Sequence, residues 1–116
     1  MIKTYCFDID GVVCATKDSN YENSVPNEAV IERMRALYNK GNTIKLQTAR
    51  GMGRTKDNVK NIPEAIKELT LSQMDEWDVP YDSIFFGKVS ADIYIDDKGF
   101  CFDNPEDLDS LPGLKE

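Results

Sequence analysis

The sequence has no histidine and few cysteines, and both facts exclude kinds of chemistry. Among its 116 residues are three cysteines, Cys6, Cys14 and Cys101. Their odd number and wide spacing argue against a disulfide framework and against a zinc site. Without histidine, no mechanism can use an imidazole as its general base.

Long apolar runs and an excess of positive charge are also missing. No segment approaches the ~20 apolar residues of a membrane span, and the first residues lack the layout of a signal peptide. The formal net charge is −7, which disfavours general binding to nucleic acids or to acidic membrane surfaces. We therefore expect a cytoplasmic protein that binds neither of them. The length predicts a single domain, residues 1–116.

The first apolar segment ends abruptly in two carboxylates. The run Ile2–Phe7 is typical of a short buried strand, and Asp8, Asp10 and Gly11 follow it. Carboxylates at the carboxyl end of a strand lie at the edge of an α/β sheet where ligands bind. Two acids so close repel each other unless a cation or a shared proton compensates, and oxygen ligands favour Mg²⁺. An ordinary turn is the competing interpretation.

The rest of the chain alternates between helical and strand patterns. Apolar residues recur at helical spacing in two stretches, and several short apolar stretches are typical of strands. This alternation predicts an α/β fold with a mostly parallel sheet and flanking helices. The expected elements are a flap over 12–24, a helix from Pro26 to Gly41, a strand over 43–48, a helix from Pro63 to Val79, strands over 83–86 and 92–95, and an irregular docked tail.

One face of this sheet is expected to be poorly covered. Right-handed crossovers carry both helices to the same face, and the connection over 87–92 is too short for a third helix. It is short even for a parallel return, which normally takes a dozen residues or more. Lys45 and Gln47 alternate with Ile44 and Leu46, which indicates a polar face or one that meets a partner. We therefore expect a homo-oligomer, a dimer or a tetramer.

Candidate site residues stand at the carboxyl ends of the expected strands, which share one edge of a parallel sheet. A carboxylate there can attack phosphorus, and a second can protonate the leaving oxygen and later activate water. A hydroxyl and an ammonium can hold phosphoryl oxygens, and further carboxylates can hold Mg²⁺. The residues are Asp8 and Asp10; Thr48, Ala49 and Arg50; Lys88; and Asp96 with Asp97.

Some of these residues also have a simple structural interpretation. Arg50 could form only a salt bridge with a neighbour, although its place beside Thr48 favours contact with the distal part of a substrate. Lys88 could be a solvated loop lysine. The basic residues Arg54, Lys56 and Lys60 are more often a solvated face than a binding patch.

Four short motifs resemble, in order, those of the haloacid dehalogenase (HAD) superfamily phosphatases. They are DIDG at Asp8–Gly11, TAR at Thr48–Arg50, GK at Gly87–Lys88 and IDDK at Ile95–Lys98. The resemblance implies a Rossmann-like core in which Asp8 is the nucleophile and Asp10 the general acid and base. It also implies that Thr48 and Lys88 bind phosphate.

The same resemblance implies a magnesium ion. Its ligands would be Asp8, the backbone carbonyl of Asp10, and Asp96. Asp97 would ligate through water or orient Asp96.

The segments Pro26–Met52 and Val79–Lys88 are more narrowly similar to small phosphatases of bacterial capsule and surface-polysaccharide biosynthesis. Those proteins lack a cap domain, and the flap and the loop after Thr48 are too short to form one here. A small phosphorylated substrate, a sugar phosphate, is therefore expected. A nucleotide or a nucleic-acid 3′-phosphate is the alternative.

Two other classes compete with a phosphatase. Response-regulator receiver domains are similar in length and also use Mg²⁺, an Asp, a Thr and a Lys. Their adjacent acids follow the first strand, whereas here the adjacent pair, Asp96 and Asp97, comes last. A non-catalytic binding protein of the same fold is the third possibility, which a complete set of motif residues disfavours.

Overall fold

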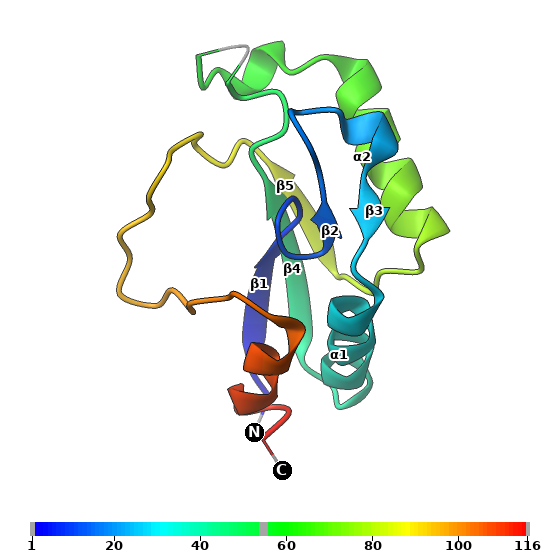
Figure 1. Ribbon diagram of the computed structural model, residues 1–116, viewed down its shortest axis with the longest axis vertical. Helices are drawn as coiled ribbons and strands as arrows, with labels where there is room; N and C mark the ends of the chain where they lie inside the picture. The colour runs from blue at the N-terminus through cyan, green and yellow to red at the C-terminus, as the bar shows by residue number, and fades with distance from the viewer. Residues whose placement is uncertain (1, 54–55, 116) are drawn as a thin grey trace.

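A computed structural model describes residues 2–53 and 56–115 and has a parallel three-stranded sheet at its centre (Figure 1). The strands are β1 (Thr4–Asp8), β4 (Thr43–Thr48) and β5 (Ser83–Phe86), in the order β1-β4-β5. All three match strands expected from the sequence. Because they run parallel, their carboxyl ends meet at one edge of the sheet. The predicted α/β, Rossmann-like class is confirmed.

Helices α1 (Glu28–Asn39) and α2 (Glu64–Glu76) connect the strands. The first begins later than predicted, because Pro26 belongs to β3 (Val25–Pro26), which pairs with β2 (Cys14–Ala15) in a two-stranded ribbon inside the flap. The next residue, Asn27, caps α1 by accepting the N–H of Val30, a role that suits asparagine. Within residues 2–53 and 56–115, no helix has the length and apolar character needed to cross a membrane.

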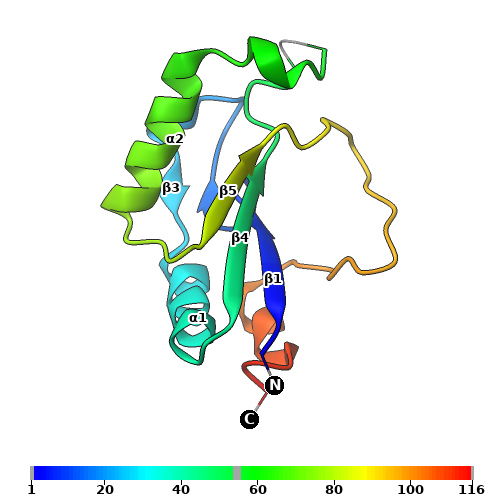
Figure 2. The ribbon, with the colours of Figure 1, turned by 180° about the vertical axis from the view of Figure 1, so that it is seen from behind.

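The core lies on one face of the sheet. Phe7, Ile44 and Leu46 are buried in one cluster with apolar residues of both helices. Residues at the alternating positions, such as Lys45 in β4 and Phe85 in β5, are exposed. Since successive strand residues point to opposite faces, both helices pack on the same face, as expected. In Figure 2 no helix stands in front of the three strands.

The tail closes the side of the core next to β1. It contains a short 3-10 helix, η3 (Pro105–Ser110), and buries Leu108 and Leu111 in the main cluster. The N–H of Gly113 donates to the hydroxyl of Tyr5 at 3.0 Å. This arrangement is close to the docked irregular segment expected for the tail.

The prediction of a fourth strand over residues 92–95 is wrong. These residues are irregular, and Ile93 and Ile95 are 78% and 97% exposed. Residues 87–104, called here the arch, leave β5 and swing away from the sheet before reaching η3 (Figure 1). The connection after β5 is too short for a right-handed parallel return. Within the described chain, β1 therefore pairs with β4 alone.

Candidate functional site

Two cavities lie at the carboxyl edge of the sheet. The larger, about 760 Å³, runs along β1 and is closed on its other side by residues of the arch and of the tail. The smaller, about 370 Å³, lies between the flap and the loop that follows β4. Asp8 lines the larger cavity, and Asp10 lines both. The two acids singled out in the sequence therefore stand where a ligand could reach them.

Asp8 is the last residue of β1 and has a cation beside it. Its Oδ1 accepts the N–H of Ile9 at 3.1 Å, and its Oδ2 lies 3.4 Å from Nζ of Lys88. Burial raises the pKa of Asp8, and the positive charge of Lys88 partly opposes that rise. A half-buried carboxylate paired with one ammonium group can act as a nucleophile toward an anionic ester.

Lys88 reaches Asp8 through a tight turn after β5. Gly87 has φ +112°, and a Cβ there would lie 2.9 Å from Cγ2 of Val59. The N–H groups of Gly87 and Lys88 both donate to the carbonyl of Thr48, at 3.2 and 3.1 Å. Nζ of Lys88 also lies 4.2 Å from the centre of the Tyr94 ring. The structure thus brings Lys88 and Asp8 together.

The carboxylate of Asp10 is held from several sides. Its Oδ1 accepts from Oγ1 of Thr16 at 2.5 Å and from Nη2 of Arg50 at 2.9 Å. Nε of Arg50 lies 3.2 Å from Oδ1 and 3.0 Å from Oδ2. Sγ of Cys14 also donates to Oδ1, at 3.5 Å. This carboxylate is fixed by protein donors.

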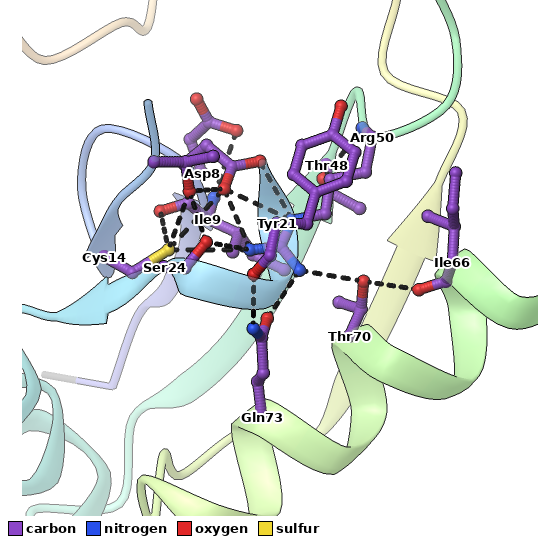
Figure 3. A network of polar contacts seen from close by, with 12 residues as sticks. Asp8, Ile9, Cys14, Tyr21, Ser24, Thr48, Arg50, Ile66, Thr70 and Gln73 are labelled. Atoms are coloured by element: carbon purple, nitrogen blue, oxygen red, sulfur yellow. Dashed lines mark hydrogen bonds and ion pairs between the residues drawn. The ribbon is translucent and has the colours of Figure 1, made fainter. Parts of the chain in front are cut away.

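The guanidinium group of Arg50 is turned toward the protein interior, although Arg50 lines the smaller cavity. Its side chain is fully buried, and all three of its guanidinium nitrogens donate to protein atoms. Nη1 donates to Thr70 and Gln73 on α2, at 3.1 and 2.6 Å. The ring of Tyr21 stands 4.7 Å from the guanidinium carbon (Figure 3). The salt bridge that the sequence allowed for Arg50 is therefore present, and its partner is Asp10.

Four residues around Arg50 were not recognised in the sequence: Tyr21 and Ser24 in the flap, and Thr70 and Gln73 on α2. Figure 3 shows them gathered around the guanidinium group. Thr70 and Gln73 are buried on the same helix face as Ile66. Two polar residues at helical spacing inside an apolar stripe were the available signal, because buried polar groups need hydrogen-bond partners.

Thr48 and Ala49 occupy different depths. Thr48 is completely buried, and its hydroxyl accepts the N–H of Arg50 at 3.0 Å. Ala49 is half-buried and lines the smaller cavity. The structure thus places the Thr48 hydroxyl, which was expected to bind phosphate, beneath the surface, whereas Ala49 lies at the cavity surface.

The second pair of acids lies on the arch. Asp96 lines the larger cavity that Asp8 also lines, whereas Asp97 is exposed and does not line it. The N–H of Lys98 donates to Oδ1 of Asp96 at 2.8 Å and lowers the pKa of that carboxyl.

The described side chains form no preformed cluster around a metal position. Among residues 2–53 and 56–115, no three acidic, histidine or cysteine side chains are grouped so that they could hold a metal ion. The ligand expected from Asp10 is its backbone carbonyl, and its carboxylate is bound by Arg50 and Thr16 instead. Asp8 and Asp96 line the same cavity but are not part of such a group.

The basic loop after β4 is described only in part. Lys56 and Lys60 are exposed, as a solvated face would be. Arg54 lies outside the described residues. Neither lysine lines the two cavities.

Comparison with known proteins identifies similar solved structures. No protein-family model and no curated protein matches the chain. A crystal structure of a Vibrio cholerae protein, described only as an MCSG target, is 31% identical over 95% of this chain and 89% of that one, with a TM-score of 0.82.

Two structures of Pnkp1/Rnl/Hen1, one of them described as an RNA repair complex, are more distant. They are 17% and 16% identical, each with a TM-score of 0.56. The matches span 82% and 80% of this chain but only 30% and 28% of those chains. At this level of identity the likeness shows the fold alone.

Proposed function

The chain belongs to the same family as this Vibrio cholerae protein, and we propose that it is a capless phosphatase of the HAD superfamily. One observation carries the proposal: Asp8 ends β1 inside a cavity with Nζ of Lys88 3.4 Å from its carboxylate, and Asp10 follows two residues later. The four ordered motifs resemble those of that superfamily and support the same assignment.

The chain's own residues account for both halves of the reaction. An oxygen of Asp8 attacks phosphorus, the bond from phosphorus to the ester oxygen breaks, and Asp10 gives its proton to that oxygen. The products are an alcohol and an aspartyl phosphate. Water then attacks phosphorus, Asp10 takes the proton, and inorganic phosphate leaves with the Asp8 carboxylate restored. Lys88 offsets negative charge on the phosphoryl oxygens.

Magnesium dependence is proposed from the motif resemblance alone, since the described side chains do not gather around a metal position. When bound, magnesium would supply charge stabilisation at the phosphoryl group. The roles given above to Asp8, Asp10 and Lys88 are separate from that contribution.

The proposed substrate is a small phosphate monoester, preferably a sugar phosphate. The smaller cavity beside Asp10 is lined by the hydroxyl residues Thr16, Ser19 and Ser90. The charge of Arg50, which also lines it, is paired with Asp10. Such a surface suits a neutral, hydroxyl-rich leaving group better than a second anion.

A nucleic-acid 3′-phosphate is the second candidate. Its support is the fold likeness to a chain of the Pnkp1/Rnl/Hen1 RNA repair complex. The net charge of −7 weighs against it, because phosphate backbones favour basic partners.

The test is a panel of phosphate monoesters, assayed with Mg²⁺ and with EDTA. It includes sugar phosphates, nucleotides and an oligonucleotide with a 3′-phosphate, with Asp8→Asn as the inactive control. We expect turnover of sugar phosphates that EDTA removes. Release of no phosphate from any member would refute the proposal, and preference for the oligonucleotide would select the second candidate.

A further inference from the structure

We propose that Arg50 is the positioning residue for Asp10, and that α2 holds Arg50 for this purpose. The inference rests on the proposed function, because it assigns Arg50 a role in proton transfer by Asp10. It replaces the sequence-based expectation that Arg50 binds the distal part of the substrate.

The contact between the two side chains is close, and the arginine side of it is buried. Nε and Nη2 of Arg50 lie 3.0 and 2.9 Å from the two carboxylate oxygens of Asp10, and the Arg50 side chain is fully buried. A two-point contact of this kind fixes the orientation of a carboxylate as well as its position.

Arg50 is itself held from the opposite side by α2. Its Nη1 donates to Oγ1 of Thr70 and to Oε1 of Gln73. The hydroxyl of Thr70 donates in turn to the carbonyl of Ile66, at 2.8 Å. The position of Asp10 is thus set by a regular helix, which is a more rigid support than a loop.

The flap is bound to the same group. Nη2 of Arg50 donates to Oγ of Ser24 at 3.3 Å, and Nε2 of Gln73 donates to the carbonyl of Tyr21 at 2.6 Å. One buried guanidinium therefore joins Asp10, which follows β1, to the flap and to α2. If Arg50 were shortened, Asp10 would lose its anchor while Asp8 and Lys88 kept their own contact.

These contacts leave one oxygen of Asp10 less occupied than the other. Oδ1 accepts from Thr16, Arg50 and Cys14. Within the described part of the chain, Oδ2 accepts from Nε of Arg50 only. Oδ2 is thus the oxygen with fewer protein donors, and the proposed proton transfer to the substrate is assigned to it.

This role predicts a dependence on the leaving group. An alkyl alcohol leaves poorly without a proton, whereas 4-nitrophenolate leaves readily as an anion. Misplacing Asp10 should therefore slow cleavage of an alkyl phosphate far more than cleavage of 4-nitrophenyl phosphate. Removing a residue that binds substrate would instead change KM, and a purely structural defect would slow both esters alike.

The experiment measures first-turnover release of alcohol from glycerol 1-phosphate and from 4-nitrophenyl phosphate over a range of substrate concentrations, so that the rate at saturation and KM are obtained separately. The variants are Arg50→Lys, Thr70→Val and Asp10→Asn, with Arg33→Lys as control because Arg33 pairs with Asp109 outside the site. For Asp10→Asn and Arg50→Lys we expect a loss of about 10²- to 10⁴-fold on the alkyl ester. On the aryl ester the loss should be less than about tenfold.

Thr70→Val should show the same selectivity to a smaller degree, and it carries the test if Arg50→Lys does not fold. Equal losses on both esters, or a change in KM alone, would overturn the inference while leaving the proposed function standing. Failure of the wild-type protein to cleave either ester, with or without Mg²⁺, would refute the proposed function and the inference with it.

Discussion

At the scale of single residues, Asp8 is a carboxylate whose ionised form is disfavoured by burial. Its pKa is raised in the native state, so ionising it at neutral pH destabilises the fold. Asp8→Asn should abolish turnover, because an amide cannot attack phosphorus. The variant should unfold at the same temperature as the wild type at pH 7, or at a higher one.

The stability gain from Asp8→Asn should disappear below pH ~3, where Asp8 is protonated in both the native and unfolded states. The measurements are phosphate release and thermal unfolding by circular dichroism at both pH values. Near-normal turnover by Asp8→Asn would eliminate the covalent mechanism.

Gly87 sets the direction of Lys88. Its φ of +112° disfavours any side chain, and a Cβ would press on Val59. Gly87→Ala should destabilise the turn by roughly 1–3 kcal/mol and lower activity by displacing Nζ of Lys88 from Asp8. Gly41→Ala is the matched control, since Gly41 also has a positive φ, +94°, but lines neither cavity, so it should lower stability without lowering activity. If the Gly87 variant kept wild-type activity, this turn would not position Lys88.

Arg50 shows where sequence reasoning reached its limit. The strand pattern placed it at the right edge of the sheet, but the direction of its side chain depends on Thr70 and Gln73, which come 20 and 23 residues later. Those residues have no strong local signal. A long flexible side chain can turn outward or inward from the same backbone position, and the partners that tertiary folding supplies decide which.

At the scale of elements, the three strands of the main sheet were predictable from the sequence. The boundaries of the helices, the ribbon β2–β3 and the course of the arch were less so. The run Thr43–Thr48 is a complete strand in the structure, because its alternating pattern matches a sheet with one covered face. Helix α1 begins later than predicted because Pro26 is extended and pairs with Cys14 of β2. That pairing depends on tertiary structure and has no local sequence signal. The strand predicted within the arch did not form because the connection after β5 is too short for a parallel return, whatever the composition of the segment.

The tail is fastened to α1 by an ion pair between Arg33 and Asp109, 2.8 Å apart. The hydrogen bond from Arg33 lowers the pKa of Asp109. The pair should therefore stabilise the fold above the pKa of an unfolded aspartate, about 3.9, and lose this effect as the pH falls through the lower native value. Asp109→Asn should lower the urea midpoint at pH 7.

The midpoint difference between Asp109→Asn and the wild type should shrink toward zero at pH 2. Asp103→Asn, a change to an exposed acid of the neighbouring arch, is the control and should leave the midpoint unchanged. Equal midpoints for Asp109→Asn and the wild type at pH 7 would show that the ion pair does not hold the tail.

At the scale of the whole molecule, apolar side chains remain uncovered. Phe85 is exposed on the open face of the sheet, and Ile93 and Ile95 are exposed on the arch. Exposed apolar surface of this kind is typical of an interface, and a neighbouring subunit could also shield the site from bulk water. We expect light scattering at micromolar concentration to give the mass of two or four chains.

Replacing both exposed isoleucines, Ile93→Lys with Ile95→Lys, should lower that mass, whereas Lys60→Ala should not. A monomeric wild-type protein with full activity would show that the tail alone completes the molecule.

The bond between Gly113 and Tyr5 joins residues 108 positions apart, and this separation has a consequence for the timing of folding. A ribosome adding ~5–20 residues per second makes Gly113 roughly 5 to 20 seconds after Tyr5. Strand β1, although synthesised first, can pair only after β4 has followed it. Until then the apolar side chains of β1 remain exposed to solvent. We therefore expect the nascent chain to depend on chaperones more than its small size suggests.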